Sequence, residues 1–189
     1  GGMTNPFFEP STLPYGMPPF AEIRDEHYRP AFEKGMADQL EETGAITASA
    51  ELPTFENTML PLERSGQLLD RVATVFYNKS SADSTDFTNE LEEEIAPLLA
   101  AHSDAIKLDS QLYWRISTLH EQLDSLGLDA ESRYLVERYH TEFTVAGAGL
   151  DEAQKQTLRD LNQRLSTLTT RFEKNLLADT NDLAVVIDD

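Results

Sequence analysis

The longest amphipathic stretch of the sequence, residues 150–182, constrains the fold most strongly. Its apolar residues recur at spacings of three and four, which predicts one apolar face on an α-helix. A helix of about 30 residues is about 45 Å long, and Asp151 with Gln154 predicts a capping box at its start. We expect earlier helices to pack along this one. The apolar positions are Leu158, Leu161, Leu165, Leu168, Phe172 and Leu176.

Shorter helices are expected before this one, each with apolar residues at helical spacing. Asp109 and Asp129 are candidate caps, and Gly127 and Gly147 are candidate helix ends. The connections are short, which favours antiparallel neighbours. We therefore expect an all-α fold, a bundle of about six mostly antiparallel helices. The expected ranges before the long helix are 25–48, 54–79, 86–106, 110–126 and 130–146.

The two ends of the chain differ from this bundle. Residues 1–2 are glycines ahead of the first methionine, and we interpret them as a cloning scar. Residues 3–20 carry five of the nine prolines, with aromatic residues between them, so we expect an extended arm that packs on the helical domain, residues 21–182. Alternating apolar residues predict the start of a strand at 183–189. Because a lone strand needs a partner, we expect the natural protein to continue beyond it.

Composition argues against several classes of protein. The net charge of −19 opposes binding to nucleic acid and to anionic membranes. No apolar run approaches the roughly 20 residues of a membrane span, and no signal-peptide pattern opens the sequence, so we expect a cytoplasmic protein. The chain has no cysteine, which excludes disulfides and cysteine-ligated zinc.

Two short motifs have part of the spacing of a metal site. In a zinc-peptidase helix, His-Glu is followed by a second histidine one turn later; here His120-Glu121 is followed by Asp124, and no third ligand is suggested. Glu137 and His140 have the Glu-x-x-His spacing of di-metal bundles, which need a second such motif and two more glutamates. We interpret the first set as exposed residues and His140 as a satisfied boundary histidine.

The other polar candidates also have structural interpretations. His102 falls on the apolar face of its helix, where a histidine is usually hydrogen-bonded in the core or at its edge. His27 is interpreted as local helix capping, and the glutamates at 92–94 as a solvated face. No Gly-rich phosphate loop and no nucleophile elbow occurs in the sequence. We therefore assign no catalytic, cofactor-binding or metal residue to this chain.

Five segments, taken together, resemble a known protein family. The likeness covers nearly the whole chain from the first methionine. It is to the N-terminal part of the bacterial peptidyl-dipeptidases, in the zinc metallopeptidase family that includes thimet oligopeptidase, neurolysin and oligopeptidase A. The segments are Asn-Pro-Phe-Phe at 5–8, Leu-Pro-Thr-Phe-Glu-Asn-Thr at 52–58, Leu-Glu-Arg-Ser-Gly at 62–66, Leu-Asn-Gln-Arg-Leu-Ser-Thr-Leu at 161–168 and Arg-Phe-Glu-Lys-Asn-Leu-Leu-Ala-Asp-Thr at 171–180.

The resemblance implies a longer, mostly helical parent in which two halves flank a deep channel. In that family one catalytic zinc is held by a His-Glu-x-x-His helix and a later glutamate, and the motif is absent from this sequence. The chain would then be a channel wall that is inactive alone. Its partners would be the C-terminal catalytic part of the same protein and short peptides, from whose C-termini the parent removes dipeptides. The competing interpretation is a stand-alone helical interaction module without enzymatic activity.

Overall fold

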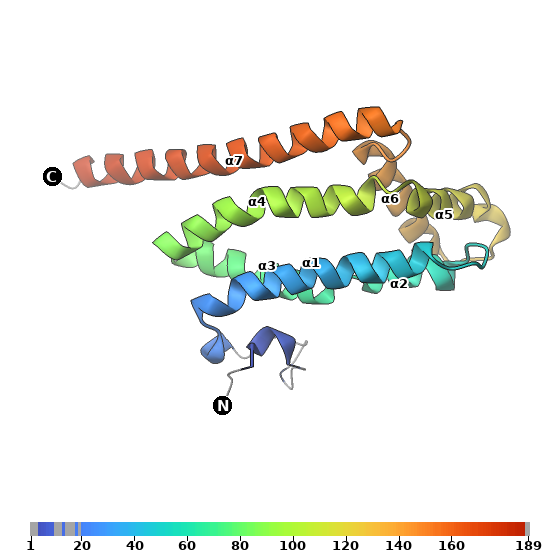
Figure 1. Ribbon diagram of the computed structural model, residues 1–189, viewed down its shortest axis with the longest axis horizontal. Coiled ribbons are helices and arrows are strands. Elements are labelled where there is room, and N and C mark those ends of the chain that lie inside the picture. Colours follow the sequence, from blue (N-terminus) through green and yellow to red (C-terminus); the bar gives the residue numbers. More distant parts are fainter. Residues whose placement is uncertain (1–3, 10–12, 14–17, 19, 188–189) are drawn as a thin grey trace.

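The computed structural model describes residues 4–9, 13, 18 and 20–187, so the two glycines of the predicted scar lie outside it. In this described part the fold is all-α, as predicted, and has no strand. None of its helices has the length and apolarity needed to cross a membrane. The α-helices are α1 (Asp25–Thr47), α2 (Leu60–Arg64), α3 (Gln67–Ala82), α4 (Asp86–Lys107), α5 (Ser110–Glu121), α6 (Ala130–Ala146) and α7 (Glu152–Ile187) (Figure 1).

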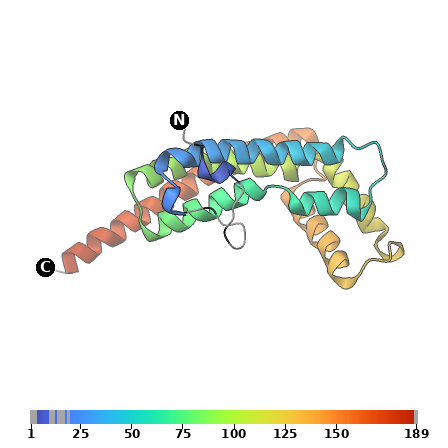
Figure 2. The same cartoon turned by 90° about the horizontal axis from the view of Figure 1, so that it is seen from below.

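Helix α4 occupies the middle of the molecule. Helices α1 and α3 pack side by side below it in Figure 1, and α7 packs along it on the opposite side. Helices α5 and α6 pack on each other at one end of this layered arrangement and lie at an angle to it (Figure 2). The fold therefore has two groups of helices, with α7 as an outer member of the first.

Each group has its own apolar core. In the first core aromatic rings meet edge to face: the Phe76 ring lies 5.5 Å from that of Phe32 and 5.4 Å from that of Tyr28, an arrangement that aromatic quadrupoles favour. The second core lies among α2, α5, α6 and the ends of α1 and α4. Its buried members are Ile46, Met59, Leu62, Ile106, Leu112, Ile116, Leu119, Leu123, Val136, Phe143 and Ala148.

The described part of the N-terminal arm packs on the first core, as predicted. Phe7 is fully buried against the ring of Tyr28, and its carbonyl accepts a hydrogen bond from Arg71. The arm is not extended throughout, because Pro6–Phe8 forms a 3-10 turn in which the Asn5 side chain accepts from the Phe7 amide. Most of the remaining arm lies outside the described residues.

The predicted helix caps are confirmed. The side chains of Asp109 and Asp129 accept hydrogen bonds from backbone amides in the first turns of α5 and α6. Asp151 accepts from the Gln154 amide at 2.8 Å, and its own amide donates to the Gln154 side chain at 3.2 Å, which completes the predicted capping box of α7. Helix α6 ends at Gly147, whose φ of 108° is in the left-handed region that glycine adopts readily.

The helix predicted over 54–79 is divided in the structure. Residues Phe55–Met59 form a π-helical turn, α2 follows, and Ser65 is extended before α3 begins. Gly66 has φ of 78°, and a Cβ there would lie 2.6 Å from the Gln39 side chain. Apolar spacing continues through this break, so the pattern alone predicts one helix. The break arises from glycine's freedom to adopt a left-handed conformation.

A second glycine sets the spacing between α1 and α3. A Cβ at Gly35 would lie 2.9 Å from the Cα of Leu69. Contacts that short do not occur between real side chains and backbone, so the two helices could not approach this closely with any other residue there. The close approach lets the side chains of the first core interlock.

The C-terminal end of α7 differs from the prediction. The helix has 36 residues and reaches Ile187, where a strand was predicted for 183–189. A strand without a partner leaves its backbone groups unpaired, whereas each added helical residue bonds within the same segment. Branched residues cost only a few tenths of a kcal/mol each in a helix. The last two residues of the predicted strand lie outside the described part.

The predicted apolar face of α7 is also not buried as expected. Leu161, Leu165, Leu168 and Phe172 are 55–67% exposed. The helix instead packs on α4 through a different face, where Lys155 is buried and Asn162 donates to the Asp104 carboxylate at 3.1 Å. Helix α7 is therefore not the centre of the bundle. The two cores lie elsewhere, and α4 is the helix on which the others pack.

Candidate functional site

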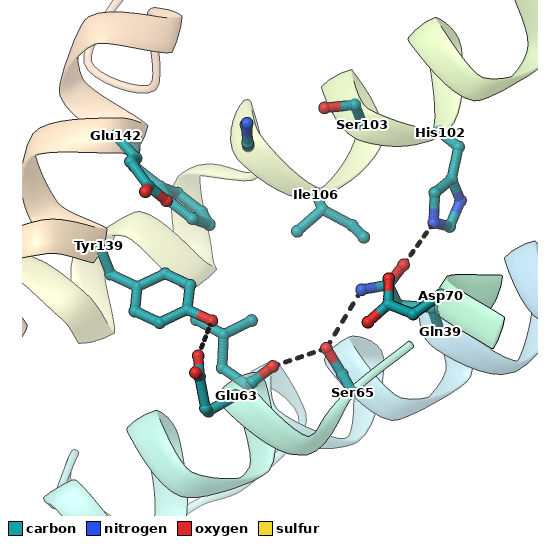
Figure 3. Close-up of a pocket in the computed structure, with 12 residues that line it drawn as sticks. Gln39, Glu63, Ser65, Asp70, His102, Ser103, Ile106, Tyr139 and Glu142 are labelled. Carbon is teal, nitrogen blue, oxygen red and sulfur yellow. Dashed lines mark hydrogen bonds between the residues drawn. The ribbon is translucent and has the colours of Figure 1, made fainter. Parts of the chain in front are cut away.

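A pocket of about 340 Å³ lies where α1, α2, α4 and α6 meet (Figure 3). Leu62, Ile106 and Phe143 form its apolar part and belong to the second core. Polar side chains from these helices, from Ser65 and from Asp70 on α3 form the remaining walls, so the pocket is more polar than a typical small-molecule site. These polar residues are Gln39, Glu63, Ser65, Asp70, His102, Ser103, Lys107, Tyr139 and Glu142.

A chain of hydrogen bonds runs along one wall of the pocket. The Nε2 of His102 lies 2.8 Å from the Gln39 Oε1, the Gln39 Nε2 donates to the Ser65 hydroxyl at 3.2 Å, and that hydroxyl donates to the Leu62 carbonyl at 2.7 Å. Because Oε1 can only accept, His102 is the donor and carries its proton on Nε2. The chain ties α4 to α1 and to the junction between α2 and α3 (Figure 3).

The second nitrogen of His102 has no hydrogen-bond partner among the described residues. Its Nδ1 is buried, and burial lowers the pKa of the ring. A neutral imidazole with one bonded nitrogen is the stable form here, because protonation would place a charged donor where nothing accepts it. The predicted role of His102 as a hydrogen-bonded core histidine is confirmed.

On the opposite wall Tyr139 and Glu63 form a close pair. The Tyr139 hydroxyl donates to the Glu63 carboxylate, and Arg138 donates to the same oxygen at 3.2 Å. Burial raises the pKa of the tyrosine, and the neighbouring Glu63 raises it further, so the phenol stays protonated. Figure 3 shows Tyr139 across the pocket from His102.

The charge around the pocket is mostly negative. Glu63, Asp70 and Glu142 line it, against one cationic lining residue, Lys107. Asp70 stands at the exposed rim, and partial burial of its carboxyl raises its pKa. In this described site the Ser65 hydroxyl bonds to Gln39 and a carbonyl and not to a histidine. The pocket can accept a small polar or cationic group, but it does not form a nucleophile with its base.

The structure brings together the histidines of the two incomplete metal motifs. The rings of His120 on α5 and His140 on α6 stack with centroids 3.8 Å apart and planes 7° from parallel. Tyr113 stacks on the far side of His140. Asp124, at the position of the second ligand in a complete motif, pairs with Arg133 at 2.8 Å. A face-to-face stack and a carboxylate paired elsewhere do not fit a zinc site.

Two further observations concern these motifs. Burial lowers the pKa of His140, and the adjacent His120 lowers it further, so His140 favours its neutral form. Across the described residues, no three His, Asp or Glu side chains gather in a way that could hold a metal ion. We therefore derive no catalytic step through a metal in this chain.

His27 caps α1, as predicted. Its Nδ1 accepts a hydrogen bond from the Arg24 amide at 2.8 Å, just before the first turn of the helix. The histidine is mostly buried, and its backbone carbonyl accepts a hydrogen bond from Asn5 of the N-terminal arm. This histidine joins the arm to the first helix and has no place in the pocket.

Two of the glutamates at 92–94 are exposed, as the interpretation of a solvated face predicts, and all three also contact a neighbouring helix. Glu92 accepts a hydrogen bond from the Ser80 hydroxyl on α3, and Glu93 lies 3.4 Å from the Lys174 ammonium on α7. Glu94 forms a bidentate pair with Arg29 on α1. Three consecutive side chains diverge by about 100° each around a helix, so each reaches a different neighbour of α4.

A buried arginine with no signal in the sequence organises the segment at 52–58. Arg115 on α5 is 3% exposed. It donates to the Thr58 hydroxyl at 3.2 Å, the Asn57 side chain at 3.0 Å and the Glu51 carbonyl at 3.1 Å. Asn57 in turn forms a capping box with Thr54. This segment is one of the five that carry the family resemblance. Its hydrogen bonds to Arg115 join it to α5, so its role in this structure is structural.

The chain is similar in sequence to part of several bacterial peptidases. No protein-family model matches it. It is 42% identical over 185 residues to the dipeptidyl carboxypeptidase of Escherichia coli (strain K12), which covers 98% of this chain and 27% of that protein. The dipeptidyl carboxypeptidase of Salmonella typhimurium is also 42% identical, over 98% of the chain and 27% of the relative.

Oligopeptidase A of Escherichia coli (strain K12) is more distant, at 27% identity over 93% of this chain and 25% of the relative. The chain thus spans about a quarter of the length of the curated relatives it matches. It matches their N-terminal region, as a segment of this peptidase family would. The resemblance inferred from the five sequence segments is confirmed.

Proposed function

We propose that this chain is the N-terminal helical part of a zinc metallopeptidase that removes dipeptides from the C-termini of short peptides. The observation that carries the proposal is the 42% identity to a dipeptidyl carboxypeptidase over 98% of the chain. Identity to oligopeptidase A is lower, at 27%, which favours removal of dipeptides over other peptidase activity.

In the parent protein this chain would form a wall of the peptide channel and would be inactive alone. The arrangement of His120 and Asp124 supports this role, because neither is free to bind zinc with the other. The zinc would be held by the C-terminal part of the parent, where it would supply an activated water molecule. The residues of this chain would contribute shape and charge to the channel.

The test compares the parent protein with the 189-residue chain. Both are incubated with a short peptide that has a free C-terminal carboxylate and with the same peptide carrying a C-terminal amide. We expect the parent to release dipeptides from the first peptide and to act poorly on the second, because recognition of the C-terminus requires its charge. The 189-residue chain should hydrolyse neither peptide and should bind no zinc.

Three results would contradict parts of the proposal. Cleavage of both peptides at internal bonds would indicate an endopeptidase. A reading frame that stops after Asp189 would mean that no catalytic part exists, and the chain would then be a stand-alone helical interaction module. Zinc-dependent hydrolysis by the 189-residue chain would overturn the inactive role assigned to it.

A further inference from the structure

The apolar face of α7 that remains exposed is a continuous surface. We call its four members, Leu161, Leu165, Leu168 and Phe172, the α7 stripe. Their spacings of four, three and four residues place them in one row on the helix, and each is more than half exposed. Isolated exposed apolar residues are common on protein surfaces, but a row of four large ones marks a contact surface.

The stripe cannot be buried by the part of the chain that the structure describes. Neighbouring faces of α7 contact α4 through the Asn162–Asp104 hydrogen bonds and the ion pair of Lys174 with Glu93, and Lys155 is buried. A rotation of α7 that turned the stripe inward would break these contacts. Figure 1 shows α7 as the outer helix of the fold, with α4 along one side only.

The surface extends from the stripe into a neighbouring groove. Leu165 lines a groove of about 460 Å³ between α7, α3 and α4, together with Tyr77, Ala96 and Leu99. A partner that covered the row could therefore insert a side chain beside Leu165. The row and the groove adjoin at Leu165, and the groove also carries polar groups from residues such as Glu92 and Thr169.

One edge of the α7 stripe is basic. Arg164 and Arg171 are exposed, lie seven residues apart and each precedes a member of the stripe, so they stand on the same side of it. Neither has a carboxylate partner among the described residues. In a chain with a net charge of −19, two unpaired cations beside an apolar row specify a partner with an apolar face and acidic residues along one border.

Two kinds of partner could cover the α7 stripe, and their charge decides between them. A second copy of this chain would bring together two bodies of charge −19, which repel. The relatives offer the other occupant, because the region matched by this chain is 27% of the length of the dipeptidyl carboxypeptidase. The remainder of such a protein would follow α7 in the same polypeptide and so would be close to the stripe at high effective concentration.

We infer that the α7 stripe, with Arg164 and Arg171 at its edge, is the surface on which the C-terminal part of the parent polypeptide packs, through an apolar face bordered by carboxylates. This inference rests on the proposed function, because it requires a longer parent. It goes further by assigning the residues that join the two parts.

The test is photo-crosslinking in the full-length parent. A photoreactive phenylalanine analogue replaces Leu168, and in the control it replaces Gln156, an exposed residue on the same helix outside the stripe. We expect the probe at Leu168 to crosslink to peptides beyond residue 189 of the same molecule, and the control to give at least fivefold less of that product. Crosslinks between two copies, or equal yields from both positions, would overturn the inference.

A second measurement leaves the four residues of the α7 stripe unchanged. Hydrogen exchange at residues 161–172 is compared between the parent and the 189-residue chain. We expect at least tenfold slower exchange in the parent, and the double variant Arg164→Glu/Arg171→Glu should lose part of that difference. Equal exchange in both proteins would contradict the inference. Neither measurement requires peptidase activity, so each remains informative if the longer parent does not release dipeptides.

Discussion

Phe76 and Phe172 are the same kind of residue in two different surroundings. Phe76, on α3, is fully buried and contacts the rings of Phe32 and Tyr28 from another helix. Phe172, on α7, is 67% exposed. Both residues stand in an apolar row at helical spacing. The first row is buried within the chain, whereas each member of the second is more than half exposed.

The contacts that hold each helix in place differ in the same way. Helices α1 and α3 approach so closely at Gly35 that only glycine fits there, and apolar side chains fill the space between them. The contacts of α7 with α4 include partly buried polar ones, namely the Asn162–Asp104 hydrogen bonds and the ion pair of Lys174 with Glu93.

The largest expected effect comes from matched truncation of the two phenylalanines. Phe76→Ala should lower the free energy of unfolding by about 3–5 kcal/mol, because it leaves a cavity in the first core. Phe172→Ala should change it by no more than about 0.5 kcal/mol in the 189-residue chain. Urea denaturation of both variants measures the difference. Equal losses would mean that the α7 stripe is buried in solution.

A smaller effect is expected at the glycine between α1 and α3. Gly35→Ala should destabilise the protein by about 1–3 kcal/mol, because the new Cβ would meet the backbone of Leu69 and force the helices apart. The matched control is Gly44→Ala in the same helix, where nothing lies within 4 Å of the new Cβ. That change should stabilise the protein by about 0.5–1 kcal/mol. Thermal unfolding distinguishes the two signs.

The smallest expected effect is a pH dependence from the buried histidine. The pKa of His102 is lowered in the folded state, so the unfolded chain binds more protons just below the ordinary pKa of about 6.5. Stability should therefore fall as the pH drops from about 7.5 to about 5.5. The lowered pKa of His140 acts in the same direction, and the raised pKa of Asp70 acts with the opposite sign at lower pH.

The control for this pH dependence is His102→Gln. Its side-chain amide can still donate to Gln39 but does not titrate. The variant should show a shallower loss of stability over the same pH interval, measured by urea denaturation at each pH. An unchanged slope would mean that His102 is not the group responsible.

Much of the fold follows from local chemistry and was predicted from the sequence. The carboxylates of Asp109, Asp129 and Asp151 stand where free backbone amides need an acceptor, and each caps the helix expected of it. Apolar spacing identified the helices around them. Such features depend on residues close together in the sequence, so no long-range contact is needed to infer them.

The features that were missed depend on residues far apart. The pocket joins Gln39, His102 and Tyr139 from three helices, and no spacing within one helix reveals that they converge. The break at Gly66 lies inside an unbroken apolar pattern. The stripe on α7 was predicted to be buried because an apolar row indicates burial without saying which partner supplies it.

The length of α7 has a mechanical consequence. At 36 residues its axis is about 54 Å long, and its hold on α4 near the far end is at Lys174, thirteen residues before Ile187. The helix therefore overhangs that hold by about 20 Å, as Figure 1 shows at its C-terminal end. A tilt of about 5° at that hold moves the helix end by about 2 Å. A small change of angle at Lys174 thus becomes a measurable displacement of the helix end at Ile187.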